Sequence, residues 1–483
     1  MVTGALLLSS PFIATAQENY SVILDGNYTW NDAAWIPSGI PGADDTITDI
    51  SSDSTTSRNF YLGSDRELVN LTVSGLNGSG TVRFMNSNVA DPNTPNVTFD
   101  ITDTFKIHRA TALRSLNTTG RLTVKTTNLV LESGANNARF LVGEAADYVN
   151  VTLEVSGTTT LKTGNTAFEL RGSATSATKV DLGDIVFENS LSGGSPGIDL
   201  LAGTLRARSL TGNGSAGTIR GAGTLVLYGD DADTYTFDSR ITGGVRVEKT
   251  GSNIQIFNPI HHAYSGGTLI SGGVLAVNNT TTSGSGLGSG AVTVANNGTL
   301  AGRGSIIPGA NNHITVEAGG TIAPSADGQA GFSNLIINNF NNAGNSAALL
   351  LEMQEGSAFT FKVDAEGNSD HIVFAYYNEG SVVFEGEEIV LNITGTLAEG
   401  QLYKLFSFRS GGPSSSELTA SGLSAGLIAG SGFEGYTPTF HYDEWGAGEI
   451  IMTVTAIPET SATLLLLLPL AITVFHRNWQ AKY

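Results

Sequence analysis

The best local cluster of carboxylates for binding a metal lies in the segment GDDADTYTFD, residues 229–238. Asp230, Asp231 and Asp233 are close neighbours there, and Asp238 ends the segment. Calcium binds through several oxygen ligands, so clustered carboxylates are the residue type it requires. Calcium is therefore the one cofactor for which the sequence offers ligands. A solvated acidic turn accounts for the same residues more simply, and we expect the turn, with no bound cofactor.

Other reactive residues form no recognisable catalytic or metal-binding pattern. His261 and His262 are adjacent, and adjacent residues of a strand point to opposite faces. The segment GSGLGSG, residues 284–290, lacks the Lys-Ser/Thr pair and the following helix of a phosphate-binding loop. The sequence also shows no nucleophile beside a base and no zinc motif. We therefore predict no catalytic residue and a protein that is not an enzyme.

The composition limits the partners and the stabilising chemistry. The chain of 483 residues contains 60 Gly and no Cys, which excludes disulfides and thiolate metal sites. Its 44 acidic and 24 basic residues give a formal net charge of -20. Such a charge repels phosphate backbones, so we expect no nucleic-acid partner.

Short runs with alternating apolar and polar residues fill the middle of the chain. Alternation with period two indicates strands with one buried and one solvated face. The runs are separated by Gly, Asn and Ser, which favour turns. Typical runs are NVTFDI (96–101), RLTVKT (121–126), VNVTLEV (149–155), ATKVDLG (177–183), GTLRARSL (203–210) and GTLVLYG (223–229).

These runs recur at a regular interval that indicates a repeat architecture. Their central residues, from Thr72 to Ile336, lie 20 to 29 residues apart. That period, with few helical segments between the runs, favours a coil of two or three short strands. We therefore predict an all-β chain dominated by a right-handed parallel β-helix over residues 61–345.

The two flanks of this region have a different composition. Residues 17–60 contain two Trp and several acidic residues, and we expect them to form an N-terminal β cap that covers the open end of the solenoid. Residues 346–456 carry longer, more aromatic strands and are predicted to form a C-terminal β domain or cap.

One stretch of the solenoid resembles a known repeat. The segment Tyr264 to Ile306, YSGGTLISGGVLAVNNTTTSGSGLGSGAVTVANNGTLAGRGSI, is similar to the autotransporter-associated β-strand repeat. The resemblance implies a parallel β-helix in a large exported bacterial protein. The glycines that carry it are Gly266, Gly267, Gly273, Gly298, Gly302 and Gly304.

Both ends of the chain have the pattern of targeting segments. Residues 1–16 read as a signal peptide with an apolar stretch and an Ala-Thr-Ala cleavage pattern. The tail, residues 457–483, resembles a PEP-CTERM sorting signal. In it, Pro458 and Glu459 precede the apolar run Leu464 to Phe475, and Arg477 follows. Thr460 stands where that family has a second Pro.

The tail resemblance implies a route and a set of partners. We expect the export machinery, a short transmembrane helix held transiently in the inner membrane, and processing by an exosortase-like enzyme. The protein then reaches the cell surface or the extracellular space. We predict a structural or adhesin-like role there, with extracellular polysaccharide as a further partner. The alternative is a lyase or glycoside hydrolase whose carboxylates converge only in three dimensions.

Overall fold

The computed structural model describes most of the chain between residues 17 and 457. The described ranges are 17–24, 27–51, 56–74, 80–86, 96–115, 120–132, 139–143, 150–162, 167–171, 178–188, 197–212, 217–258, 261–279, 284–338, 349–375, 382–384, 389–409, 427–443 and 448–457. In this part the chain is nearly all-β, and its one helix is the 3-10 turn η1 (Pro324–Asp327). No helix among these residues is long and apolar enough to cross a membrane. The predicted signal peptide and the apolar run of the tail lie outside the described residues.

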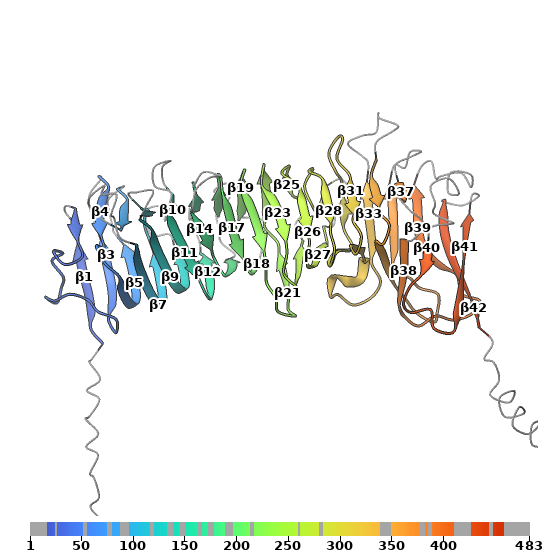
Figure 1. The fold of residues 1–483 in the computed structure, drawn as a ribbon, viewed down its shortest axis with the longest axis horizontal. Coiled ribbons are helices and arrows are strands. Elements are labelled where there is room, and N and C mark those ends of the chain that lie inside the picture. The colour runs from blue at the N-terminus through green and yellow to red at the C-terminus, as the bar shows by residue number, and fades with distance from the viewer. Residues whose placement is uncertain are drawn as a thin grey trace, which may run out of the picture. The chain divides into compact units, whose positions relative to one another are not determined.

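The chain forms two compact units. Unit 1 comprises residues 1–229 and 236–247, and unit 2 comprises residues 230–235 and 248–483. Each unit is built from long parallel sheets, an arrangement consistent with a parallel β-helix (Figure 1). Two strands, β21 (Thr234–Phe237) and β23 (Arg246–Lys249), include residues of both units.

Unit 1 contains one sheet that divides and a second sheet that does not. In the first sheet, β9 pairs in parallel with β11 through its first half and with β12 through its second half. The strands before the division are β1 (Asn19–Ile23), β3 (Thr46–Ser51), β5 (Arg66–Ser74), β7 (Val97–Ile107) and β9 (Leu122–Leu131). The first branch is β11 (Val151–Val155), β14 (Lys179–Asp181), β17 (Thr204–Ala207) and β20 (Thr224–Leu227). The second branch is β12 (Thr158–Leu161), β15 (Asp184–Phe187) and β18 (Ser209–Gly212).

The second sheet of unit 1 supplies one short strand to each coil. Its strands are β2 (Tyr28–Thr29), β4 (Arg58–Tyr61), β6 (Val82–Met85), β8 (Thr111–Arg114), β10 (Arg139–Val142), β13 (Ala167–Leu170), β16 (Ile198–Leu200), β19 (Thr218–Gly221) and β22 (Arg240–Gly243). Each coil after the division therefore has three strands, one on each of three faces. Successive coils of unit 1 repeat after 20 to 34 residues, as the pairs Leu205–Leu225 and Asn70–Thr104 show.

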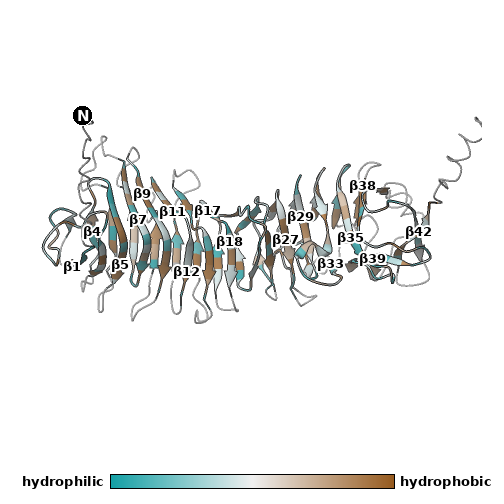
Figure 2. Ribbon diagram, turned by 90° about the horizontal axis from the view of Figure 1, so that it is seen from below, coloured by the Kyte–Doolittle hydropathy of each residue, from teal (hydrophilic) through white to brown (hydrophobic). Residues whose placement is uncertain are grey.

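The alternation seen in the sequence places one set of side chains inside unit 1. Figure 2 shows hydrophobic and hydrophilic residues alternating along β7 and β9, and their apolar members are buried. Aromatic rings stack edge to face from coil to coil in this interior: the Phe105 and Phe140 centroids are 5.6 Å apart, and those of Phe140 and Phe168 are 5.8 Å apart. Such pairs stabilise beyond the area they bury.

Asparagine side chains join successive coils at the corners. Each accepts a hydrogen bond from a backbone N–H of the next coil, a group that the parallel ladder leaves unpaired where the chain turns. The donor–acceptor pairs are Arg121 N to Asn96 Oδ1 at 3.0 Å, Thr104 N to Asn70 Oδ1 at 3.1 Å, and Ser305 N to Asn279 Oδ1 at 2.8 Å in unit 2. These asparagines therefore help to hold neighbouring coils together.

Unit 2 repeats the same pattern of parallel strands on three faces. One row is β24 (Ile254–Phe257), β27 (Gly273–Val277), β29 (Gly298–Gly302), β32 (Thr321–Ile322), β35 (Ala358–Val363), β38 (Ile389–Gly395) and β40 (Leu427–Ala429). A second is β26 (Thr268–Ile270), β28 (Val292–Val294), β31 (Ile314–Val316), β34 (Leu351–Met353) and β37 (Val382–Phe384). The third is β30 (Ser305–Ile306), β33 (Asn334–Asn338), β36 (His371–Ala375) and β39 (Tyr403–Arg409), continued by antiparallel β42 (Glu449–Ala456) and β41 (Tyr436–Asp443). The short strand β25 (Ala263–Tyr264) precedes β26.

Parallel pairing crosses both predicted cap boundaries. At the N-terminal side, β1 pairs with β3 and β3 with β5, all in parallel, across residue 60. At the other side, β31 pairs in parallel with β34 across residue 345. The C-terminal strands differ in spacing instead, since Ile314 pairs with Leu351, 37 residues later. Longer connections within continuing coils explain the change in composition that suggested a separate domain.

Candidate functional site

The outer face of the first branch of unit 1 carries two rows of polar side chains. Inward Leu153, Val180 and Leu205 are in register, so their neighbours on either side point outward. One row contains Thr152, Lys179 and Thr204, and the other contains Glu154, Asp181 and Arg206. Neighbouring strands lie roughly 4.8 Å apart, so each row presents one functional group per coil.

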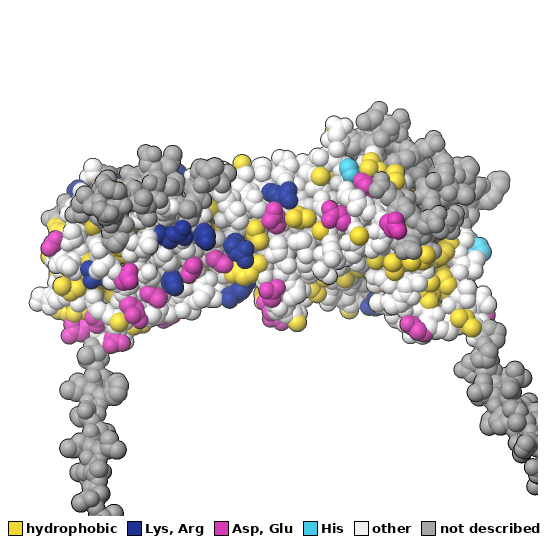
Figure 3. All heavy atoms as spheres, viewed as in Figure 1, with side chains coloured by type: hydrophobic (Ala, Val, Ile, Leu, Met, Phe, Trp, Pro, Cys, Tyr) yellow, Lys and Arg dark blue, Asp and Glu magenta, His cyan; other side chains and the backbone are white. Residues whose placement is uncertain are grey.

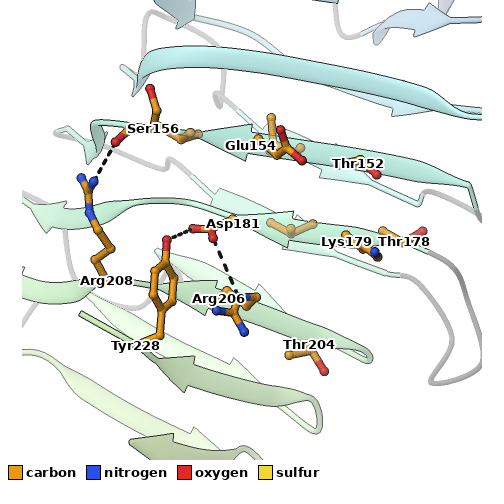
Figure 4. A pocket seen from close by; sticks show the side chains of 13 residues that line it. Thr152, Glu154, Ser156, Thr178, Lys179, Asp181, Thr204, Arg206, Arg208 and Tyr228 are labelled. Carbon is orange, nitrogen blue, oxygen red and sulfur yellow. Dashed lines mark hydrogen bonds and ion pairs between the residues drawn. The ribbon is translucent and has the colours of Figure 1, made fainter. Parts of the chain in front are cut away.

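These rows line a groove of about 860 Å³. Its lining comprises Thr152, Leu153, Glu154, Val155, Ser156, Thr178, Lys179, Val180, Asp181, Thr204, Arg206, Arg208 and Tyr228. Figure 4 shows the labelled polar side chains standing on three successive strands, with Tyr228 just beyond the end of β20.

Tyr228, Asp181 and Arg206 form a connected group in this groove. The Tyr228 hydroxyl donates a 2.8 Å hydrogen bond to Asp181 Oδ1 and so reaches back over two coils (Figure 4). The Arg206 guanidinium carbon lies 4.4 Å from the centroid of the Tyr228 ring, and Arg206 Nε lies 3.8 Å from Asp181 Oδ2. A guanidinium over an aromatic face is a favourable cation–π arrangement. The ring therefore fixes the position of an arginine that remains half exposed.

Arg208 closes one side of the groove and is fully committed to the protein. Its guanidinium donates to the carbonyls of Ser156 and Gly157, each at 2.8 Å, and forms an ion pair with Asp184 at 2.5 Å. The hydrogen bond to Asp184 raises the pKa of Arg208 above its ordinary value. Arg208 thus acts as a fixed wall of the site.

The protonation state of Tyr228 favours hydrogen bonding over proton transfer. Burial raises the pKa of the Tyr228 phenol well above its ordinary value, and the hydrogen bond to Asp181 acts in the same direction. A general base works best with a pKa near the working pH, and the shift takes Tyr228 away from that range. The phenol is therefore a neutral donor that orients Asp181.

Lys179 and Glu154 are the most accessible charges of the groove. Both side chains are exposed, and Glu154 lies 3.9 Å from Lys125 in a loose ion pair. Figure 3 shows Lys and Arg side chains gathered over the strands that Figure 1 labels β11, β14 and β17, with acidic side chains between them. The groove thus offers fixed cations, carboxylates and hydroxyls on one face.

The acidic cluster predicted as a weak calcium site forms a turn. Asp230, Asp231 and Asp233 are exposed, and Asp231 accepts hydrogen bonds from the Asp233 backbone N–H and the Tyr235 hydroxyl, both at 3.1 Å. Asp230 accepts one from Ser252 N at 3.3 Å. No group of three or more His, Asp or Glu among the described residues is placed to hold a metal ion. Two of these carboxylates are engaged locally, since Asp231 accepts from its own turn and Asp230 accepts from the next coil.

The adjacent histidines lie just before β25 and differ in burial. His262 is buried, and its ring centroid lies 4.7 Å from that of Phe257, whereas His261 is only partly buried. The two imidazoles therefore belong to different environments and form no joint metal site.

The repeat glycines are structural. Gly266 and Gly267 precede β26, Gly273 and Gly298 begin β27 and β29 and pair with each other, and Gly302 and Gly304 flank the step to β30. Gly302 has a φ of 114°, and a Cβ there would collide with the Val277 carbonyl oxygen of the previous coil. The residues of the predicted sorting signal, Pro458, Glu459 and Arg477, lie outside the described residues.

The groove residues are absent from the sequence predictions, although the sequence contains an indication of them. Alternation within ATKVDLG and GTLRARSL already places Lys179, Asp181 and Arg206 on one side of their strands. Their convergence depends on the register between coils, and the position of Tyr228 depends on a side chain that reaches back over two coils. Two arginines two positions apart on an outward face were the available indication.

Comparison with known proteins adds no relative. No protein-family model matches the chain, and no curated protein matches it.

Proposed function

We propose that this chain is an exported structural or adhesin-like protein of a bacterial cell surface that contacts extracellular polysaccharide. The observation that carries the proposal is the polar groove on the outer face of the first branch, where fixed cations, carboxylates and hydroxyls project from successive coils. A face that repeats its functional groups once per coil suits weak, multivalent contacts with a repetitive polymer.

The proposal includes the finer architecture and the route. The parallel coils wind in the right-handed sense, and the segment Leu464 to Phe475 forms a transmembrane helix with Arg477 on the cytoplasmic side. The Pro458-Glu459 step is the recognition element of an exosortase-like enzyme. The resemblance of residues 264–306 and 457–483 to segments of exported bacterial proteins supports this route.

Native cells provide the test of export and sorting. We expect surface-accessible protein whose mature C-terminus, measured by mass spectrometry, ends near Thr460. Deletion of residues 457–483 should yield soluble periplasmic protein that never reaches the surface. Protein confined to the cytoplasm would contradict export, and an intact Tyr483 on surface-exposed protein would replace processing by simple anchoring.

A polysaccharide-cleaving enzyme is the second candidate. The observation in its favour is that Glu154 and Asp181 stand on adjacent strands beside Lys179, Arg206 and a tyrosine. Most glycoside hydrolases use a pair of carboxylates to cleave the glycosidic bond. Shortening of any polysaccharide by the wild-type protein, abolished by Asp181→Asn, would establish this candidate over the first.

A further inference from the structure

We propose that the groove on the first branch of unit 1 is a binding site for an acidic, uronate-containing polysaccharide. Arg206 and Lys179 bind the sugar carboxylates, and Asp181, Glu154 and the exposed Thr204 hydroxyl bind the ring hydroxyls. The proposal rests on the proposed function only for the source of the polymer, because the binding itself requires no particular cellular location.

The two cations available to a ligand differ in how firmly they are held. Arg206 is fixed by the Tyr228 ring on one side and by Asp181 on the other, yet half of its side chain remains exposed. A planar, preorganised guanidinium forms two parallel hydrogen bonds to a carboxylate at little entropic cost. Lys179, exposed on the neighbouring strand, adds a mobile point charge.

The carboxylates select a sugar polymer over a phosphate polymer. Glu154 and Asp181 accept hydrogen bonds, and a ring hydroxyl donates them. A phosphodiester backbone offers negative charge and no donor, so these groups repel it. An acidic polysaccharide offers both carboxylates and hydroxyls and therefore matches both rows of the groove.

The spacing of the rows matches an extended polymer that runs across the strands. Successive coils place functional groups roughly 4.8 Å apart, which is close to the length of one sugar residue in an extended chain. In the row that contains Asp181, the order of groups along the coils is Glu154, Asp181, Arg206. A uronate lying at Arg206 thus has neighbouring sugar hydroxyls at the two carboxylates.

The distribution of charge in the chain supports an anionic ligand at this unit. Unit 1 holds 17 of the 24 Lys and Arg residues and 22 of the 44 Asp and Glu residues, a formal charge of -5. Unit 2 holds the remaining seven cations and 22 acids, a formal charge of -15. An anionic polymer is repelled less by unit 1 than by unit 2, and the groove concentrates the cations of unit 1 locally.

The experiment measures the binding of polygalacturonate oligomers to the purified full chain in mild detergent. Two further probes are carboxyl-reduced polygalacturonate, which is uncharged, and single-stranded DNA, which is a phosphate polymer. We expect polygalacturonate to bind at least about tenfold more tightly than either, since the reduced polymer cannot form the charge-assisted hydrogen bonds to Arg206 and the DNA backbone offers no hydroxyl donors.

The chain offers a matched control for the central arginine. Arg206 and Arg220 both lie in unit 1, each faces one aspartate, and their side chains are 50% and 51% exposed. Arg220, however, stands on β19 of the other sheet. We expect Arg206→Gln to weaken polygalacturonate binding about tenfold and Arg220→Gln to change it less than twofold. Lys179→Gln, a change at an exposed position, should weaken binding about threefold and keeps the test valid if Arg206→Gln fails to fold.

Each result decides the proposal. The expected order of losses, with unchanged thermal melting of the variants, supports it. Equal losses in Arg206→Gln and Arg220→Gln, equal binding of DNA, preference for the reduced polymer, or no binding would each overturn it. Because binding is measured on purified protein, a failure of the binding proposal does not contradict export and sorting. Conversely, a cytoplasmic location of the protein would contradict export and would not change a positive binding result.

Discussion

Unit 1 and unit 2 are built from the same kind of three-faced parallel coil, but they differ in what fills the coils and in what covers them. Unit 1 carries a near-balanced surface, whereas unit 2 has a formal charge of -15. Unit 1 stacks aromatic rings inside, from Trp30 to Phe168. The repeat segment of unit 2 instead stacks Val, Leu and Ala with glycines at the strand ends. The same backbone arrangement therefore accepts different side chains inside the coils and different charges on their outer surface.

The difference inside explains why only one region resembles a repeat family in sequence. In residues 264–306, strands approach so closely that glycine is required at fixed positions, as at Gly302 and Gly273. Unit 1 also has close approaches, as at Gly221, where a Cβ would collide with the Leu200 carbonyl oxygen, but large rings fill much of its interior and many combinations of apolar residues can do so. A close backbone approach thus requires glycine at a particular position, whereas an apolar interior requires only that the residue be hydrophobic.

The largest expected effect tests the aromatic interior. Phe99→Ala removes a ring whose centroid lies 5.6 Å from that of Trp30 and 5.7 Å from that of Phe84. We expect this substitution to lower the free energy of unfolding by about 4 kcal/mol. A double-mutant cycle of Phe99 and Phe84 should give a coupling of about 1 kcal/mol. Denaturant unfolding measures both values, and hydrogen exchange should place the loss in unit 1. Additivity of the two substitutions would show that the rings act only as filling.

The second prediction tests the glycine-dependent packing of unit 2. At Gly302, φ is 114° and a Cβ would meet the Val277 carbonyl, so Gly302→Ala should cost about 3 kcal/mol. Gly63 in unit 1 has a φ of 72° with no atom within 4 Å of an added Cβ. Gly63→Ala should therefore cost only about 1 kcal/mol. Similar losses in thermal unfolding for both would contradict a role for close backbone approach.

Much of the fold follows from local sequence. Alternation and turn residues predicted the strands, and their interval predicted the stacking of coils. The pairing of Leu300 with Ile322, 22 residues later, falls within the predicted interval. The local composition gave no sign that parallel pairing continues from Ile314 to Leu351, because aromatic content and a longer connection look the same in a new domain as in a continuing coil.

The candidate site was much less predictable than the fold. Asp230, Asp231 and Asp233 are close in sequence, and yet Asp231 binds its own turn while Asp230 binds the backbone of the next coil. Asp181 and Tyr228 are 47 residues apart and share a hydrogen bond. In a solenoid, residues that lie one coil apart in the sequence become neighbours in space. Which functional groups meet therefore depends on the strand register between coils, and their distance along the sequence does not show it.

A third prediction concerns a buried cation in unit 2. Lys249 is fully buried, and its ammonium donates to the carbonyls of Gly251 and Gly272. Burial lowers its pKa from 10.5 to about 8, while Asp230 and Asp231 oppose the shift. Between pH 8 and pH 10.5 the unfolded chain binds a proton that the folded chain does not, so the free energy of unfolding should rise with pH, by on the order of 2 kcal/mol.

The matched variant for this prediction is Lys249→Met, which keeps the length of the side chain and removes the titration. Melting temperatures in matched buffers between pH 7 and pH 10.5 provide the measurement. We expect the rise in the wild-type protein and its absence in the variant. A rise of equal size in both proteins would assign the pH dependence to other groups.

The smallest expected effect concerns the reason why unit 1 keeps so many cations. Glu132 lies 3.0 Å from Lys106 and 4.0 Å from Lys162, and all three side chains are about one-third exposed. Lys106 lowers the pKa of Glu132 below its ordinary value. This contribution to stability is present above pH 4.5, the ordinary value, and is lost as the pH falls through the lowered pKa. Solvent screening limits it to less than about 1 kcal/mol.

Glu132→Gln should therefore cost less than about 1 kcal/mol at pH 7, and the cost should vanish in high salt and at low pH. The control is Glu449→Gln in unit 2, which removes the 2.9 Å pair with Lys404 and should cost about as little. Denaturant unfolding at two salt concentrations measures both. Small and equal costs mean that the cations of unit 1 add little to its stability, which leaves ligand binding as the better reason for them. A cost well above 1 kcal/mol for Glu132→Gln alone would instead mean that unit 1 keeps its cations because its own carboxylates need them.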